Sequence, residues 1–377
     1  MEPKKMALVT LIVTVAGFGL LIGLQAFTMT QVANFQSGPT LSTDLFGTPT
    51  GDVDLAISGS TTCYPAITAH ADTYMTYHSN YDIRVSGGGS GQGADDVYSG
   101  IVDVGMMSRP MKSAEHSDMI DKYGSYNDVR FALDGVTIIV DKSSFDAGST
   151  TMSWMTLDAL HMIYSGAIAE WDDLAALGPG YSDINNAPNQ DIAEITREEG
   201  SGTRETFEDY TLYYGGGTSG QKLSSNSSYN SAVGGYATAD GNPAMKETVG
   251  STDYSIGYVG LAFYSSAVHY KIDIKPWNTT TTSWEDPVEA TAETIANFTY
   301  PISRFLHLMV PGSTIPTNVR AFIDFVLGVD PLVGDLGQSI VESVGYIKIF
   351  DDGYDTRTAT DESKKGGIIL RTSGTGP

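Results

Sequence analysis

Four short loops rich in glycine, serine and threonine follow predicted strands and carry groups that can donate hydrogen bonds to an anion. They are the segments GSTTCYP (59–65), GGGSGQG (87–93), DVGMMSR (103–109) and REEGSGTR (197–204). The first, second and fourth lead directly into predicted helices. The first turn of a helix has unpaired backbone N–H groups and a partial positive charge, which favours an anion. Glycine lets the backbone approach the ligand, and serine or threonine adds a hydroxyl donor.

Each loop by itself also has an ordinary structural explanation, because serine and threonine cap helices and glycine turns the chain. Four such loops in one chain are more informative, since the carboxyl ends of parallel strands gather at one crevice. Arg197 adds a guanidinium, which can bind two oxygens of a tetrahedral anion at once. The alternative for Arg197 is an ion pair with Glu198 or Glu199. Arg109 and Arg204 are predicted to form salt bridges rather than to bind a ligand.

The sequence gives no support for catalysis, a metal centre or a cofactor. Ser90 and Ser201 do not lie in the Gly-x-Ser-x-Gly turn of a nucleophilic serine. The six histidines lack the spacing of metal ligands, and the single cysteine excludes an internal disulfide and a cysteine-based zinc site. Cys63 is predicted to be a small buried side chain, with a reactive thiolate as the alternative. No Gly-x4-Gly-Lys-Ser/Thr motif is present, so nucleotide hydrolysis would belong to a partner.

Composition limits the class of protein. The chain has 377 residues, 41% of them hydrophobic, which is enough for two domains with their own cores. Acidic residues outnumber basic ones 45 to 21, for a formal net charge of -24. This balance argues against nucleic acid as a partner, because a polyanion needs clustered Lys and Arg. It is typical of a soluble surface in an extracellular setting.

The N-terminal segment predicts a membrane anchor. Lys4 and Lys5 precede an uncharged segment from Met6 to Phe27, which as a helix would span about 33 Å, close to the ~30 Å of a bilayer core. The lysines should stay in the cytoplasm, so the rest of the chain lies outside. The segment is longer than the apolar core of a signal peptide. We therefore expect a transmembrane helix at 1–27, with cleavage near residues 31–33 as the alternative, and a flexible linker at 28–53.

Downstream of the linker, strand patterns alternate with helical ones, as in an α/β fold with mainly parallel sheets. Strands are expected at 54–58, 81–86, 102–106, 131–141, 191–197, 256–263 and 302–310. Helices are expected at 65–77, 94–99, 154–164, 169–177, 203–213 and 318–327. The strand at 131–141 is long enough to cross between two lobes. Residues 215–242 are predicted to form a loop, and residues 351–377 a loose tail.

Several motifs occur in a recognisable order. They are Gly59-Ser60-Thr61-Thr62…Pro65, Gly89-Ser90-Gly91, Leu133-Asp134-Gly135-Val136, Ile163-Tyr164-Ser165-Gly166…Trp171-Asp172-Asp173-Leu174, Arg197…Gly200-Ser201-Gly202-Thr203, Ile256-Gly257-Tyr258-Val259 and Tyr300-Pro301-Ile302. Over residues 54–350 the chain resembles the PstS family, the substrate-binding proteins of the high-affinity phosphate ABC importer. The resemblance implies a two-lobed periplasmic-binding-protein fold (type II) with phosphate between the lobes. Lobe one would combine 54–135 with 264–350, and lobe two would be 136–263.

The resemblance also implies the residues that hold phosphate. Carried over to this chain, they are Thr61, Thr62, Ser90, Arg197, Ser201, Gly202 and Thr203, and the backbone N–H of Cys63 is an alternative to one threonine contact. Members of the family place an aspartate after the third strand to accept the proton of hydrogen phosphate, whereas this chain has Ser108. A serine hydroxyl can donate or accept, so Ser108 joins the predicted site. Rejection of sulfate is then less strong than a carboxylate would give, unless Glu198 or Glu199 supplies the acceptor.

The sequence therefore predicts an extracytoplasmic, membrane-tethered receptor, or a secreted one if the N-terminal segment is cleaved. It would capture inorganic phosphate and deliver it to an ABC permease and its ATPase, with the lobes closing around the anion. The alternatives are a receptor for another oxyanion (sulfate, molybdate or tungstate), a surface or sensory protein without transport, and a phosphatase-like enzyme.

Overall fold

The computed structural model describes residues 51–213, 238–278, 280–351 and 354–377. Residues Thr48–Pro377 form one compact unit, separate from Met1–Gly47. The predicted transmembrane helix at 1–27, nearly all of the linker at 28–53 and most of the predicted loop at 215–242 lie outside the described residues. Within the described part of the chain, no helix combines the length and the apolar character needed to cross a bilayer.

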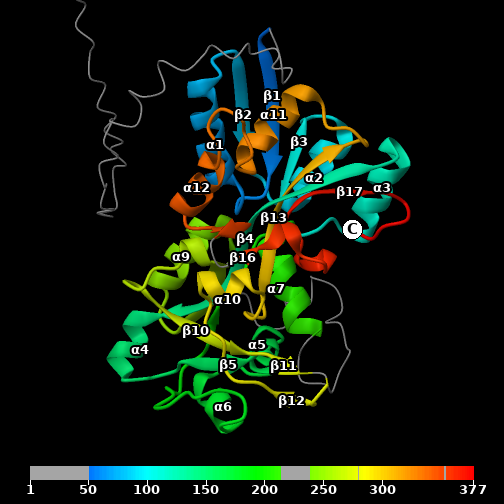
Figure 1. Cartoon of the computed structure of the whole chain (residues 1–377). Coiled ribbons are helices and arrows are strands. Elements are labelled where there is room, and N and C mark those ends of the chain that lie inside the picture. The colour runs from blue at the N-terminus through cyan, green and yellow to red at the C-terminus, as the bar shows by residue number, and fades with distance from the viewer. Residues whose placement is uncertain (1–50, 214–237, 279, 352–353) are drawn as a thin grey trace, which may run out of the picture. The chain divides into compact units, whose positions relative to one another are not determined.

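The first lobe is built on a sheet whose parallel strands run in the order β2-β1-β3, followed by the antiparallel strands β13 and β4 (Figure 1). The strands are β1 (Val53–Gly59), β2 (Tyr81–Ser86), β3 (Val104–Met107), β4 (Tyr126–Asp141) and β13 (Ser303–Pro311). Two groups of helices pack with this sheet, namely α1 (Tyr64–Tyr77), α11 (Thr317–Val326) and α12 (Leu336–Ser343) together, and α2 (Ser90–Ser99) with α3 (Ser113–Tyr123). Leu55 and Ile57 of β1 are buried in its core, as the alternation of β1 predicts.

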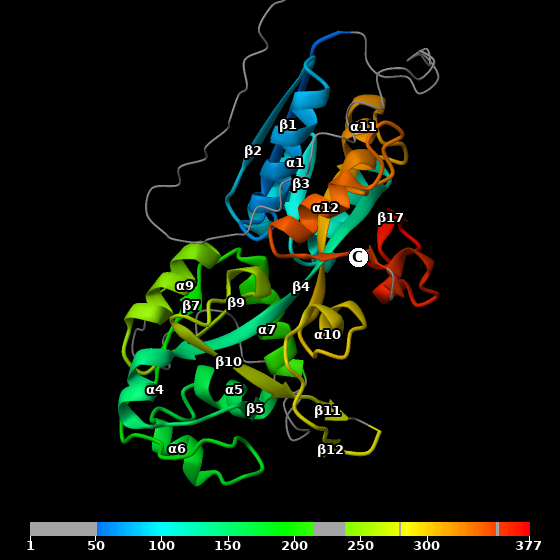
Figure 2. The same ribbon diagram turned by 60° about the vertical axis from the view of Figure 1, so that its left-hand side comes forward.

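Strand β4 joins the two lobes, as Figure 1 and Figure 2 show. Its residues up to Gly135 pair with β13, and from Val136 onward they pair with β9 (Ser255–Gly260). All 16 of its residues are buried, among them the charged Asp128, Arg130 and Asp134. The prediction of a strand that crosses between lobes is therefore confirmed, although the strand begins five residues before the predicted 131.

The second lobe is built around the far end of β4. Its strands are β5 (Trp154–Thr156), β6 (Ala193–Glu194), β9 and β10 (His269–Lys275), with β7 (Thr196–Arg197) and β8 (Thr238–Ala239) as a separate pair. Its helices are α4 (Lys142–Gly148), α5 (Leu157–Tyr164), α6 (Trp171–Ala176), α7 (Gly202–Tyr213) and α9 (Gly241–Ser251). Three smaller elements follow β9 and β10, namely the 3-10 turn η3 (Leu261–Phe263), the hairpin of β11 (Trp277–Asn278) with β12 (Ser283–Trp284), and α10 (Ala292–Ala296).

Several predicted boundaries are wrong. Strand β10 pairs with residues 138–141 of β4 and with β5, so it belongs to lobe two and the chain does not return to lobe one at 264. The predicted helix 154–164 begins with strand β5, the predicted strand 191–197 is two short strands, and the predicted strand 256–263 ends in η3. The predicted loop 215–242 ends in β8 and the start of α9. The strand pairings that set these boundaries join segments far apart in sequence, so the local periodicity of the sequence does not reveal them.

The C-terminal segment 351–377, predicted to be loose, is part of the fold. After β14 (Ile347–Lys348) and the hairpin of β15 (Phe350–Asp351) with β16 (Tyr354–Asp355), it forms two 3-10 turns, η4 (Thr356–Thr358) and η5 (Glu362–Lys364). Strand β17 (Gly367–Arg371) then pairs with residues 126–130 of β4. Buried Arg371 forms an ion pair of 3.0 Å with buried Asp128 of β4. The prediction failed because the polar residues around β17 outnumber its three central apolar side chains.

Candidate oxyanion-binding site

The loop that follows β1 is held against strand β3 through the backbone. The N–H of Ser60 donates to the carbonyl of Met106 over 2.9 Å. A Cβ atom on Gly59 would lie 2.2 Å from the same carbonyl oxygen, and the φ of Gly59 is 131°. Only glycine fits this position. The turn before helix α1, which includes Thr61 and Thr62, is thereby fixed beside the end of β3.

The lobe-one loop 87–93 directly contacts the lobe-two loop 197–204. The N–H of Gly91 donates to the carbonyl of Gly200 over 3.2 Å. A Cβ atom on Gly202 would lie 2.2 Å from Oγ of Ser90 and 2.6 Å from Oγ of Ser108. The absence of a side chain at Gly202 therefore lets the first turn of α7 approach both serines. All three predicted lobe-one loops meet the predicted lobe-two loop, although they are remote in sequence.

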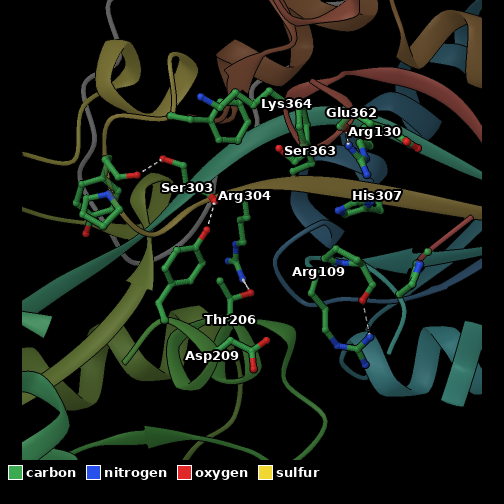
Figure 3. A pocket seen from close by; sticks show the side chains of 18 of the residues that line it. Arg109, Arg130, Thr206, Asp209, Ser303, Arg304, His307, Glu362, Ser363 and Lys364 are labelled. Carbon is green, nitrogen blue, oxygen red and sulfur yellow. Dashed lines mark hydrogen bonds between the residues drawn. The ribbon is translucent and has the colours of Figure 1, made fainter. Parts of the chain in front are cut away.

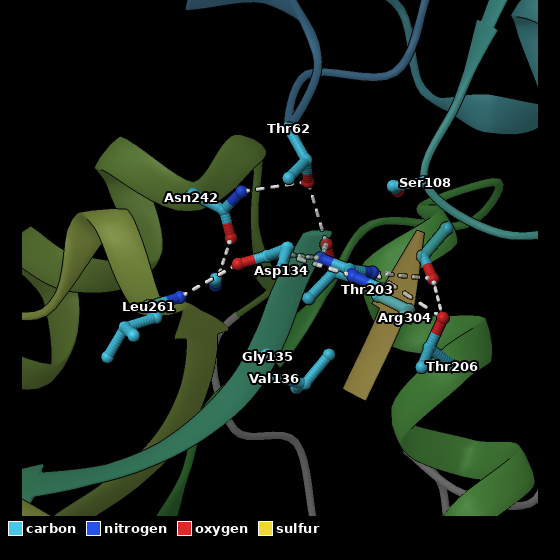
Figure 4. Close-up of polar contacts among 12 residues, drawn as sticks. Thr62, Ser108, Asp134, Gly135, Val136, Thr203, Thr206, Asn242, Leu261 and Arg304 are labelled. Carbon is cyan, nitrogen blue, oxygen red and sulfur yellow. Dashed lines mark hydrogen bonds and ion pairs between the residues drawn. The ribbon is translucent and has the colours of Figure 1, made fainter. Parts of the chain in front are cut away.

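The closest hydroxyl contact across the lobes joins Thr62 and Thr203. Their Oγ1 atoms lie 2.9 Å apart, and both side chains are buried. The Nδ2 atom of Asn242 donates to Oγ1 of Thr62 over 3.0 Å (Figure 4). Ser90 and Ser108 form a second buried hydroxyl pair, 3.3 Å apart, in which the N–H of Ser108 also donates to Oγ of Ser90.

Arg197 is fully buried and contacts both lobes. Its Nη2 donates to Oγ1 of Thr61 over 3.0 Å, and its Nη1 donates to Oδ1 of Asn242 over 2.9 Å. It also forms the predicted alternative, a bidentate ion pair with Glu198 in which both distances are 2.7 Å. Burial alone would raise the pKa of Glu198, but hydrogen bonding to Arg197 and its charge bring that pKa below its usual value. The carboxylate of Glu198 is therefore ionised and already occupied by a cation.

Ser201 and the other two arginines also lie close to this cluster. Oγ of Ser201 accepts from the N–H of Arg204 over 3.3 Å at the start of α7. Arg204 pairs with Glu208, and Arg109 pairs with Glu115 and Glu205. The prediction of salt bridges for Arg109 and Arg204 is therefore confirmed. Eight predicted residues come together here, namely Thr61, Thr62, Ser90, Ser108, Arg197, Ser201, Gly202 and Thr203.

Three buried residues next to these loops were not among the predicted site residues: Asp134, Asn242 and Arg304. Nη2 of Arg304 donates to Oγ1 of Thr203 over 3.0 Å and to Oδ2 of Asp134 over 2.7 Å. Oδ1 of Asp134, in β4, accepts from the N–H of Leu261, the first residue of η3, over 3.1 Å. The motif Leu133-Asp134-Gly135-Val136 could have identified Asp134 from the sequence. No local pattern marks Asn242 or Arg304.

The thiol of Cys63 is buried and donates to the carbonyl of Met107 over 3.2 Å. Burial raises the pKa of this thiol to about 12, so the small buried side chain is the better of the two interpretations and the thiolate is disfavoured. Across the residues that the structure describes, no group of three or more His, Cys, Asp or Glu side chains is arranged to hold a metal ion.

A cavity of about 710 Å³, drawn in Figure 3, is lined by none of the eight predicted site residues. Thr206, Asp209 and Tyr210 of α7 line one side, and η5 and β13 line others. Its guanidinium groups are held in ion pairs with carboxylates; these arginines are Arg109, Arg130, Arg304 and Arg371. The cavity comes next to the predicted site residues at Arg304, which donates to Thr203. The helix N-termini and hydroxyls that suit a small oxyanion lie at the four loops and not in the cavity.

Comparisons with known proteins found a matching family model and several relatives. A family model described as a PBP superfamily domain matches residues 36–330. Phosphate-binding protein PstS of Bacillus subtilis is 27% identical over 297 residues, covering 79% of this chain and 81% of the relative. Phosphate-binding protein PstS of Staphylococcus saprophyticus is 26% identical over 327 residues, covering 86% and 88%.

The fold is shared with a Clostridium perfringens protein that was assigned as a phosphate ABC transporter substrate-binding protein and solved with bound phosphate. The TM-score is 0.59 at 26% identity, and the likeness covers 79% of this chain and 100% of the other. The resemblance to the PstS family and the two-lobed α/β fold that it implied are thus confirmed. Because the family model spans most of the sequence, the chain belongs to the PBP superfamily.

Proposed function

We propose that the protein binds inorganic phosphate between its two lobes outside the cell and delivers it to an ABC importer made of a permease and an ATPase. The observation that carries this proposal is the contact of 2.9 Å between the hydroxyls of Thr62 and Thr203, which come from opposite lobes. Hydroxyls, helix N-termini and one buried guanidinium that meet at a single point suit a tetrahedral oxyanion. The ligand residues proposed are Thr61, Thr62, Ser90, Ser108, Arg197, Ser201, Gly202 and Thr203.

Capture and delivery follow from the arrangement of these donors. An anion that accepts hydrogen bonds from both lobes stabilises the closed arrangement relative to an open one. The closed arrangement is then the signal that a permease can recognise. We place the receptor on the outer face of the membrane, tethered through residues 1–27, because Lys4 and Lys5 precede the apolar segment.

A second oxyanion is a specific alternative ligand, since the carboxylates near the site are already occupied. Glu198 is paired with Arg197, and Asp134 is paired with Arg304. Neither is free to accept the proton of hydrogen phosphate or to repel sulfate, and Ser108 stands where a carboxylate would do both. Sulfate, molybdate and tungstate are therefore tested in the same experiment.

Titration calorimetry of the full chain tests the proposal. We expect saturable binding of phosphate with one site per chain, and competition by sulfate that is weaker than phosphate itself. If none of the four oxyanions binds, the proposal is contradicted. If sulfate binds more tightly than phosphate, sulfate is the ligand in place of phosphate. A parallel assay with an aryl phosphate should show no turnover.

A further inference from the structure

The direction in which a hydroxyl points its proton decides whether it helps or hinders an anion. A threonine hydroxyl can donate one hydrogen bond and can also accept, whereas a guanidinium or a backbone N–H can only donate. A neighbour that can only donate therefore forces the hydroxyl oxygen to accept from it. The hydroxyl proton must then point away from that neighbour. The partners of Thr62 and Thr203 therefore decide which directions are left for their protons.

Arg304 settles the direction for Thr203. Its Nη2 lies 3.0 Å from Oγ1 of Thr203, and because a guanidinium has no acceptor, the threonine oxygen must accept. Arg304 cannot turn away, since its Nη2 and Nε both donate to Oδ2 of buried Asp134, over 2.7 and 3.1 Å. The positive charge behind the oxygen also orients the O–H dipole away from Arg304. The proton of Thr203 can then be given to Oγ1 of Thr62, 2.9 Å away, or to an anion bound between the lobes.

Asn242 settles the direction for Thr62. Its Oδ1 lies 2.9 Å from Nη1 of Arg197 and 3.3 Å from the N–H of Gly260. Both of these neighbours can only donate, so the atom that faces them must be the oxygen of the amide. The atom facing Oγ1 of Thr62 at 3.0 Å is therefore the NH2 group, and Thr62 must accept from it. Asn242 is fully buried, so bulk solvent does not reach these contacts.

We propose that Asn242 and Arg304 are positioning residues that turn the hydroxyl protons of Thr62 and Thr203 towards the bound oxyanion. The inference rests on the proposed function and goes beyond it, because neither residue is among the proposed ligands. It assigns this part of the site to deprotonated oxygens of the ligand, since both hydroxyls have an acceptor position filled and a proton to give. Figure 4 shows Asn242 and Arg304 approaching the threonine pair from different sides.

A double-mutant cycle separates this role from a merely structural one. Asn242→Asp keeps the acceptor for Arg197 and Gly260 but replaces the NH2 group with an oxygen, so Thr62 must donate to it instead of to the ligand. Thr62→Val removes the hydroxyl at nearly constant shape. If Asn242 acts through Thr62, the loss of affinity caused by Asn242→Asp will be smaller in the Thr62→Val background. The added negative charge weakens anion binding equally in both backgrounds, so it cancels in the comparison.

The measurement is calorimetric phosphate affinity of the full chain and the three variants, with melting temperatures to show that each is folded. We expect Asn242→Asp to weaken phosphate binding at least tenfold in the native background. In the Thr62→Val background, the fold-loss caused by Asn242→Asp should be at least five times smaller. Independent effects, equal within twofold in the two backgrounds, would overturn the proposal. The cycle of Arg304→Gln with Thr203→Val gives the same test should Asn242→Asp not fold, because the glutamine amide removes the charge and can also accept. If the unmodified chain binds no oxyanion, the proposed function fails instead.

Discussion

Replacing Arg197 with alanine should sharply weaken phosphate binding. The guanidinium is fully buried and donates to Thr61, Asn242 and Glu198. A hydrogen bond to a charged group contributes about 1.5–3 kcal/mol, and removing one partner of a buried ion pair leaves the other uncompensated. The carboxylate of Glu198 would then face the anion without its cation. We expect a loss of at least ~2 kcal/mol, which is roughly 30-fold in the dissociation constant.

The assay is titration calorimetry of the full chain with phosphate at constant salt. Arg320→Ala is the matched control, because Arg320 is half-exposed and pairs only with Asp324 one helical turn away among the contacts described; it should leave the affinity unchanged. Adding Glu198→Gln to Arg197→Ala should recover part of the affinity, since it removes the stranded charge. A loss of less than twofold in Arg197→Ala would refute the assignment of Arg197 to the site.

Three further predictions concern the close approach of the lobes and two buried groups. Gly202→Ala should weaken phosphate binding at least tenfold, because the new methyl would lie 2.2 Å from Oγ of Ser90; an unchanged affinity would show that the loops do not meet. Burial raises the pKa of Glu194 to about 8, and its Oε1 has no hydrogen-bond partner among the described residues. Between pH 4.5 and 8 the unfolded chain ionises while the folded chain does not, so stability is lost as pH rises. Glu194→Gln should therefore raise the melting temperature at pH 8 and leave it unchanged at pH 4; equal shifts at both would contradict the argument. The thiol of Cys63 should resist iodoacetamide at pH 8 until the protein unfolds, and rapid native labelling would contradict its burial.

Local pattern was sufficient to find the loops of the candidate site. Each of the eight predicted residues lies where a strand gives way to a loop or a helix, and such junctions have recognisable glycine and hydroxyl residues. Strand β2 was predicted with its observed bounds, 81–86, because its alternation is local. The long strand β4 was found because residues 136–140 are all β-branched.

The features that sequence did not reveal depend on contacts between distant segments. Asn242 and Arg304 have no motif of their own, and they matter because they approach Thr62 and Thr203 from positions 180 and 101 residues away. The same holds for β17, whose partner in β4 lies more than 200 residues earlier in the chain. Polar residues that act only through their neighbours cannot be recognised until the neighbours are known.

The central claim is that loops from both lobes surround one tetrahedral anion. A crystal structure of the protein grown with phosphate tests it most directly. Our account predicts one phosphate within hydrogen-bond distance of Thr62, Arg197 and Thr203, with no phosphate in the cavity lined by Asp209 and η5. Phosphate bound in that cavity alone, or a bound anion that contacts one lobe only, would contradict it.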